Sequence, residues 1–339
     1  MAVTLKTIAE KANVSVMAVS SALNGAVSAR ISASKKEHIR KIAAELGYKP
    51  NVLARRLSGG ASRLIGVIAD SYLHNSSSRM LRGIEVAANK ADYRVLIAEQ
   101  HESVNSLSEI FRVFEQYGVD GVICISHDYS GTEEEVRKLL CNIKNLVLWE
   151  AFPDTDIPYV AFDVTDAVRT LVNGWKAVGR TRAAIVLNAD FNRQMTSRAA
   201  LFTGLCKEAG LEAEIVSIEA DPDDRNISVC MQAALAKDIL PRKIDCILAE
   251  NDIWACGLMG AAAKAGIKIP EDIAIAGWDD EIFCCSLVPQ LASISIRAEE
   301  IGHKLVEIFV NLVEHKKAES VVVPAEFYCR ESCGFNSSQ

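Results

Sequence analysis

The hydrophobic and polar positions divide the chain into two regions with different periodicities. Residues 1–49 contain only short helical patterns, in which apolar residues recur every three or four positions. From Leu64 onward, short runs rich in β-branched residues alternate with longer stretches of helical periodicity. Strands that alternate with helices predict a parallel sheet with helices on both faces. The pattern therefore predicts a small all-α head followed by an α/β body.

Three short helices are predicted in the head. Thr4, Ser15 and Ser32 each stand where a hydroxyl can cap the helix that follows. Asn13 stands where the chain must turn between the first helix and the second, Val16–Leu23, and Asn tolerates the left-handed conformation better than most residues. Two short helices joined by a tight turn, with a third that buries their apolar faces, have helix-turn-helix geometry. A generic three-helix bundle is the alternative.

The strands of the body are predicted in eight apolar runs, at 64–70, 94–99, 121–126, 146–151, 183–189, 213–219, 246–251 and 273–279. So many strands would make an unusually wide single sheet, so two sheets in two lobes are expected. Between head and body, the segment NVLARRLSGG (51–60) predicts a helix of one or two turns and a glycine linker. Such a short helix is unstable alone in water, so we expect a partner to order it.

Charge separates the same two regions. Residues 1–60 hold ten Lys and Arg against three Glu, a net charge of +7, whereas the whole chain has a net charge of -7. The remaining residues therefore have a net charge of -14. A basic head on an acidic body suits a polyanionic partner that only the head contacts, the alternative being an ordinary solvated surface.

Several function classes lack support in the sequence. The apolar runs are far shorter than the ~20 residues of a membrane helix, and nothing at the N-terminus marks a secreted protein, so we expect a cytoplasmic protein. The ten cysteines form no CxxC and no zinc spacing, so they are interpreted as small buried hydrophobic residues, with no metal and no cofactor expected. The chain has no P-loop, GxSxG or HExxH, and its six histidines are scattered, so no enzyme is predicted.

At this point the residues resemble the LacI/GalR repressor family. TLKTIAEKANVSVMAVSSALN and ELGYKPNVLARRL are similar to the family's helix-turn-helix and hinge helix. ILAENDIWACGLMGAAAKAGIKIPEDIAIAGWDD, VPQLASISI and FYCRESCG are similar to its body and closing strand. These segments occur in family order over nearly the whole chain. A solute-binding protein of a transporter is the rival class, and the basic head counts against it.

The resemblance implies a transcription regulator, a repressor of the helix-turn-helix type, that binds double-stranded operator DNA as a homodimer often paired into tetramers. It implies a body like the periplasmic sugar-binding proteins, with two lobes, two doubly wound parallel sheets and three chain crossings near 162–164, 290–294 and 322–325. The expected domains are a helix-turn-helix domain (1–49), a hinge helix and linker (50–60), lobe 1 (61–162 plus 293–323) and lobe 2 (163–291 plus 324–339).

The resemblance also assigns DNA contacts. The second helix would lie in the major groove, with Val16, Met17, Ser20 and Ser21 toward base edges. This face is unusually apolar, so it can offer methyl and hydroxyl contacts to thymine and adenine but no bidentate grip on guanine. The operator sequence stays open.

Two further groups of DNA contacts are expected. The groups that suit phosphate oxygens are Thr4, Ser15, Asn24, Ser32, Lys35 and Lys36, for which capping or a solvated face is the alternative. In the hinge helix, Leu57 matches the family's minor-groove wedge, Ala54 is small enough to approach the groove floor, and Arg55 can neutralise a phosphate. Two symmetric hinges would imply a palindromic operator.

A ligand site is expected between the lobes, at the carboxyl ends of the strands. Motif matching assigns Glu150, Asn251 and Asp279 to this site, and the alternative is that Asn251 and Asp279 cap the helices after them. Arg198 is the candidate replacement for an arginine that relatives usually carry nearer the following glycine. Trp278 is expected to provide a stacking face.

This pocket departs from the family pattern. The position three residues before Gly204, where relatives usually carry the arginine, is Leu201, and residues 74–80 (HNSSSRM) lack the aromatic residues found there in relatives. An ordinary hexose or purine is therefore disfavoured. A sugar of another kind or another small polar metabolite is the expected effector, with control by a partner protein as the alternative.

Overall fold

The computed structural model describes residues 3–24, 31–48, 61–70, 75–100, 104–126, 131–189, 193–219 and 227–336. The chain forms two compact units, Met1–Arg63 and Leu64–Gln339, and each has its own hydrophobic core. The mixture of a helical unit and an α/β unit confirms the predicted fold class.

In the described part of the head, three helices surround a small core. They are α1 (Leu5–Ala12), α2 (Val16–Asn24) and α3 (Ala33–Glu45). Asn13 ends α1 in the left-handed conformation, with φ 49° and ψ 51°, which confirms the expected sharp turn. The side chains that fill the space between the three helices are Ile8, Val19, Ala22, Ile39 and Ile42.

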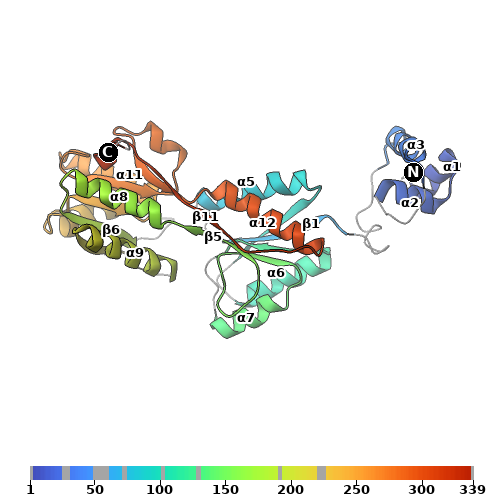
Figure 1. The fold of residues 1–339 in the computed structure, drawn as a ribbon, viewed down its shortest axis with the longest axis horizontal. Coiled ribbons are helices and arrows are strands. Elements are labelled where there is room, and N and C mark those ends of the chain that lie inside the picture. The colour runs from blue at the N-terminus through green and yellow to red at the C-terminus, as the bar shows by residue number, and fades with distance from the viewer. Residues whose placement is uncertain are drawn as a thin grey trace. The chain divides into compact units, whose positions relative to one another are not determined.

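The body contains two six-stranded sheets. The first has the order β11-β5-β4-β3-β1-β2, and all its pairs are parallel. Its strands are β1 (Leu64–Asp70), β2 (Arg94–Gln100), β3 (Gly121–Cys124), β4 (Leu146–Trp149), β5 (Tyr159–Asp163) and β11 (Val321–Pro324). Figure 1 shows α5 (Asn75–Lys90) and α12 (Ala298–Val313) on one face, and α6 (Val104–Tyr117) and α7 (Glu133–Cys141) on the other.

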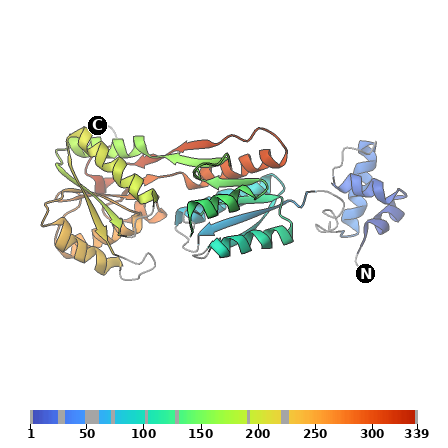
Figure 2. The ribbon, with the colours of Figure 1, turned by 90° about the horizontal axis from the view of Figure 1, so that it is seen from below.

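The second sheet has the order β12-β10-β9-β8-β6-β7, in which only the β10–β12 pair is antiparallel. Its strands are β6 (Arg182–Asn188), β7 (Glu212–Ile218), β8 (Cys246–Ala249), β9 (Ala274–Trp278), β10 (Ala292–Ser295) and β12 (Glu326–Tyr328). Its helices are α8 (Thr165–Ala177), α9 (Arg193–Ala209), α10 (Ile227–Ala234) and α11 (Asp252–Lys264). Figure 2 shows helices packed on both faces of this sheet, as a doubly wound fold requires.

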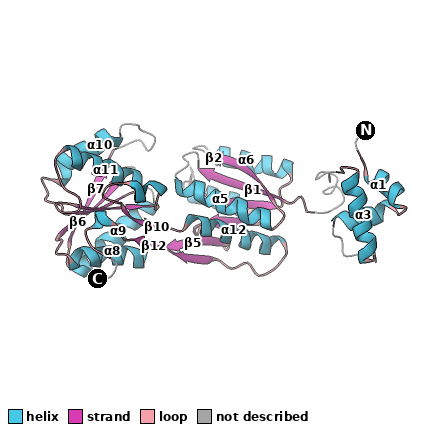
Figure 3. Cartoon of the chain, turned by 90° about the horizontal axis from the view of Figure 1, so that it is seen from above, coloured by secondary structure: helices cyan, strands magenta, loops and turns pink. Residues whose placement is uncertain are grey.

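All eight predicted runs form strands, and the structure adds β5, β10 and β11 to them. β12 includes the start of the expected closing strand. The chain passes between the sheets after β5, after β10 and between β11 and β12 (Figure 3). Because Ala292–Ser295 pairs with β9, the second crossing lies after Ser295 rather than near 290–294. The expected closing strand over FYCRESCG is also shorter than predicted, because residues Glu331–Cys333 form a 3-10 turn.

Candidate functional site

The caps expected in the helix-turn-helix are present. Thr4 caps α1 in a reciprocal arrangement with Thr7, and its hydroxyl accepts the Thr7 N–H at 3.3 Å. The Ser15 hydroxyl accepts the Ala18 N–H at 3.1 Å at the start of α2, and the Ser32 hydroxyl accepts the Lys35 N–H at 3.4 Å at the start of α3. These hydrogen bonds fix where each helix begins, and so which side chains the head presents.

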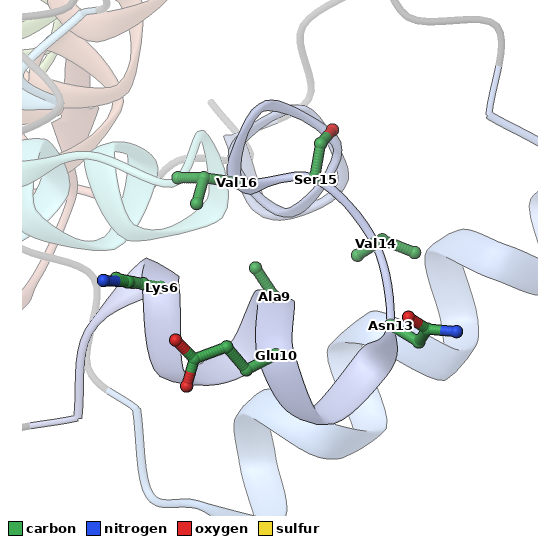
Figure 4. A pocket seen from close by; sticks show the side chains of 7 residues that line it. All are labelled: Lys6, Ala9, Glu10, Asn13, Val14, Ser15 and Val16. Atoms are coloured by element: carbon green, nitrogen blue, oxygen red, sulfur yellow. The ribbon is translucent and has the colours of Figure 1, made fainter.

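The first turn of α2 presents apolar side chains to solvent. Met17 is 78% exposed and Val16 is 46% exposed. A hollow of about 490 Å³ lies next to this turn and is lined by residues of α1, of the turn and of α2. Figure 4 shows Lys6 and Val16 on the same side of it. Exposed apolar side chains beside a basic group are suited to the methyl groups and phosphates of a major groove.

Ser21 differs in exposure from the other residues expected to face the bases. It is only 6% exposed, whereas Ser20 is half-buried. A serine side chain extends little beyond the helix backbone, so the surrounding residues of the head cover it. In this conformation Ser21 does not reach outward as Met17 does.

The start of α3 has the chemistry of an anion site. Lys35 and Lys36 lie in its first turn, which contains no acidic residue. Helix N-termini attract anions through their unsatisfied N–H groups and dipole, and adjacent lysines strengthen this attraction. Asn24 ends α2, while Ala54, Arg55 and Leu57 lie outside the described residues.

In the body, the expected ligand residues gather around Arg198. The guanidinium carbon of Arg198 lies 4.1 Å from the centroid of the Trp278 ring, and its Nη1 is 3.5 Å from the Glu250 carbonyl oxygen. Burial lowers the pKa of Arg198, while the nearby carboxylates of Asp279, Glu250 and Glu150 raise it. Four of the five expected residues therefore share one electrostatic environment, and Glu250 is a member that the sequence had not suggested.

The backbone at this site is unusual. Glu150 follows β4 with φ 68°, and Asp279 follows β9 with φ 98°. Left-handed backbone in residues other than glycine is uncommon and concentrates at functional sites. Each acidic residue directly follows a tryptophan at a strand end, Trp149 and Trp278, so the carboxylates mark the carboxyl edges of the two sheets.

Asn251 has the capping role that was the alternative for it. Its side-chain oxygen accepts the Trp254 N–H at 2.9 Å at the start of α11. Trp149, Trp254 and Trp278 are all buried, with exposed fractions of 5%, 3% and 2%. The face of the Trp278 ring is covered by the Arg198 guanidinium. Strand-end aromatics here fill the core, as large apolar groups usually do.

Arg79 joins the two lobes, a role that sequence reasoning missed. Its Nη1, on α5 of the first lobe, donates to the carbonyl oxygens of Asp279 at 3.0 Å and Asp280 at 2.9 Å in the second. Asp280 in turn pairs with Arg330, with 2.6 Å between Oδ1 and Nη2. The turn after β9 is thus held from both lobes.

Asp252 has a structural role. It is fully buried, and its two oxygens accept hydrogen bonds from the Ser293 hydroxyl at 2.6 Å and the Glu281 N–H at 2.7 Å. Burial raises the pKa of Asp252 to about 7, against the lowering effect of these hydrogen bonds.

Metal-ligating clusters and membrane-spanning helices are both absent from the described ranges. No group of three or more His, Cys, Asp or Glu among these residues could hold a metal ion. No helix in the same ranges is long and apolar enough to cross a membrane.

Comparison with known proteins agrees with both units. The family described as "Bacterial regulatory proteins, lacI family" matches residues 4–51, and "Periplasmic binding protein-like domain" matches residues 174–333. Among curated proteins, the HTH-type transcriptional regulator KdgR of Bacillus subtilis (strain 168) is 24% identical over 97% of each chain. Catabolite control protein A of Staphylococcus aureus (strain Mu50 / ATCC 700699) is 26% identical over 96% of this chain and 97% of its own length.

Solved structures show the same fold. The Lac repressor dimer bound to operator and an anti-inducer has a TM-score of 0.83 and 22% identity, with 98% of this chain and 99% of that chain covered. The complex of the transcriptional regulator CelR with cellobiose has a TM-score of 0.67 and 18% identity, with 97% and 99% covered. The head, the body and their order are therefore those of one known class. The chain is a transcription regulator whose N-terminal helix-turn-helix matches the lacI family of bacterial regulatory proteins and whose body matches a periplasmic-binding-protein-like domain.

Proposed function

We propose that this regulator binds a palindromic operator as a homodimer and that a small polar ligand in the cleft between the two lobes controls its binding. The observation that carries the DNA-binding part is the surface of the helix-turn-helix. There the exposed Met17 and Val16 on α2 accompany the lysine-bearing N-terminus of α3. The regulator would act in the cytoplasm, where it meets operator DNA. Its proposed activity is binding and involves no catalysis.

On DNA, helices α2 and α3 would make different kinds of contact. Val16, Met17 and Ser20 provide methyl, thioether and hydroxyl contacts to base edges in the major groove. Lys35 and Lys36 neutralise phosphates and fix the position of the head, with the hydroxyls of Ser15, Ser32 and Thr4 alongside. In the hinge, Leu57 enters the minor groove as a wedge, flanked by Ala54 and Arg55.

In the body, the two sheets and their helices are the two lobes of a sensor. The KdgR and CelR proteins that share this architecture are named as regulators, and CelR is described as a complex with cellobiose. In this chain the carboxylates of Glu150, Glu250 and Asp279 favour a ligand rich in hydrogen-bond donors. Lobe rotation on ligand binding changes the spacing of the two hinge helices, and so permits or prevents their ordering on DNA.

The salt dependence of DNA binding tests the head. Fluorescence anisotropy with a labelled duplex from upstream of the regulator's own operon gives the slope of log affinity against log salt. Lys36→Gln should flatten this slope by about 0.9 for each phosphate that the variant no longer neutralises. Lys264→Gln, at an exposed lysine on α11 of the body, is the matched control and should leave the slope unchanged. Equal slopes for the two variants would refute the assigned role of Lys36.

A thermal-shift screen of sugars, sugar phosphates and nucleosides tests the body. A ligand that binds the folded state raises the melting temperature, by an amount that grows with its concentration relative to the Kd. Asp279→Asn should remove most of the shift produced by any active compound. A full shift in that variant would place the ligand elsewhere.

A further inference from the structure

Two thiols are in contact near the C-terminal end of the body. The sulfur atoms of Cys329 and Cys333 are 3.5 Å apart. Cys329 directly follows β12, and Cys333 ends the 3-10 turn Glu331–Cys333. Cys329 is partly exposed, whereas Cys333 is fully buried, and none of the ten cysteines of the chain is in a disulfide. One thiol of this pair is therefore reachable from solvent, and the other lies directly behind it.

The backbone holds the two thiols in this arrangement. The Cys333 thiol donates to the Arg330 carbonyl oxygen at 2.9 Å, and the Phe335 carbonyl oxygen is 3.2 Å from the Cys329 sulfur. The Ser332 hydroxyl donates to the Ile275 carbonyl oxygen at 2.6 Å, which ties the turn to β9. The thiols thus stay close together without a large rearrangement of the chain.

Five other cysteines lack this combination. Burial raises the pKa of Cys206 to about 12 and raises the pKa of Cys246 and of Cys284, so these thiols are poor nucleophiles at neutral pH. Cys141 and Cys285 are exposed. The neighbours Cys284 and Cys285 are one buried and one exposed residue, and the structure gives no contact between their sulfurs. Reaction between two thiols of one chain is therefore favoured at Cys329 and Cys333.

We propose that Cys329 and Cys333 are a site of reversible oxidation, at which hydrogen peroxide closes an intramolecular disulfide. The Cys329 thiolate attacks peroxide, forms a sulfenic acid and releases hydroxide. The Cys333 thiol then attacks that sulfur, the S–O bond breaks, and water leaves as the S–S bond forms. The sulfur atoms need to approach from 3.5 Å to about 2.05 Å. A small dithiol reductant reverses the reaction by thiol–disulfide exchange.

The disulfide would enclose Arg330, which links this turn to the proposed ligand site. Arg330 Nη2 is 2.6 Å from Asp280 Oδ1, and Nη1 donates to the Leu291 carbonyl oxygen at 2.8 Å. Asp280 adjoins Asp279, and its carbonyl oxygen accepts a hydrogen bond from Arg79 of the other lobe. Only this connection rests on the proposed ligand function, since the disulfide itself depends on the thiol contact alone.

Peptide mapping tests the site directly, because trypsin cuts after Arg330, between the two cysteines. The full chain is treated with hydrogen peroxide, its remaining thiols are blocked with an alkylating agent, and it is digested without reductant. We expect peptides 318–330 and 331–339 to appear joined, with a mass about 2 Da below their sum. A dithiol reductant should separate them again.

Three variants make the outcome decisive. In Cys333→Ser, Cys329 should accumulate a sulfenic acid that dimedone traps, while Cys329→Ser should leave Cys333 reduced because it is buried. Cys141→Ser, which removes an exposed cysteine elsewhere, should form the joined peptides as fast as the unaltered chain. The proposal is overturned if peroxide oxidises Cys141 while both peptides stay reduced. It is equally overturned if Cys329 proceeds to sulfinic acid with Cys333 unreacted, or if it joins a cysteine of another chain.

Discussion

Replacing Gly302 by alanine should force apart two helices of the first lobe. Helices α5 and α12 lie side by side on one face of the sheet and meet through Gly83 and Gly302. A Cβ on Gly302 would lie 2.3 Å from the Met80 carbonyl oxygen and 2.8 Å from the Ile84 nitrogen. Both are backbone atoms of α5, so no change of rotamer can relieve the contact.

Overpacking and helix propensity act in opposite directions on the free energy of unfolding of Gly302→Ala. Overpacking a filled core costs typically about 1–3 kcal/mol, and rigid backbone neighbours favour the upper end. Alanine in place of glycine inside a helix stabilises the folded state by about 1 kcal/mol, because alanine has the higher helix propensity. We therefore expect Gly302→Ala to lower the free energy of unfolding by about 2 kcal/mol. For a domain of this size that corresponds to a fall in Tm of about 4–8 °C.

The matched control is the same substitution at Gly204, in the interior of α9. No atom lies within 4 Å of a Cβ placed there, so only the gain in helix propensity remains, about 0.5–1 kcal/mol of stabilisation. Thermal unfolding followed by far-UV circular dichroism should therefore show shifts of opposite sign for the two variants. A Gly302→Ala variant that melts at or above the unaltered protein would show that the helices are not packed as closely as described.

Three further predictions concern charge and exposure. Because the pKa of Asp252 is raised to about 7, above its value near 4 in the unfolded chain, the folded state binds the extra proton. The free energy of unfolding should thus fall by the order of 4 kcal/mol between about pH 4 and pH 7, and urea unfolding should show Asp252→Asn to be less pH-dependent. Arg330→Met should lower the free energy of unfolding by about 3 kcal/mol, because the Asp280 carboxylate, whose side chain is 16% exposed, loses its ion pair. Adding Asp280→Asn should restore part of that loss in the same urea assay. Met17→Ala should weaken operator binding several-fold in anisotropy without changing Tm, whereas Ile282→Ala, at an 88% exposed position of the body, should change neither.

Local signals in the sequence predicted local structure well. Hydroxyl side chains before helices became caps, as at Thr4 and Ser32, because a cap depends on residues only three positions apart. The strands with long apolar runs were also found, including the partly exposed edge strand β7, because such a run is visible within a few neighbouring residues. β5 and β11 were not identified, because they are short and partly exposed, so their sequences show no sustained apolar run.

The contacts of the candidate site were less predictable, because they join residues far apart in sequence. Arg79 and the carbonyl oxygens that it reaches are separated by 200 and 201 positions, and no periodicity relates them. Glu250 was passed over because its neighbour Asn251 carried the family motif. The carboxylate of Glu250 nevertheless accepts a hydrogen bond from the Asn188 N–H at the end of β6, which draws it to the same sheet edge.

Arg198 and Leu201 on α9 contact different parts of the body. Positions 198 and 201 are three apart on α9, so they lie on the same side of the helix about one turn from each other. Leu201 packs against the core of the body, and Arg198 is the arginine whose guanidinium lies at this end of the sheet. From there it lies over Trp278 and among the carboxylates of Glu150 and Asp279. A guanidinium engaged in this way is poorly placed to receive a phosphate or carboxylate, because an anion would have to compete with the protein's own acidic groups. The acidic groups around Arg198 are therefore a physical reason to expect a neutral or cationic ligand in the proposed pocket.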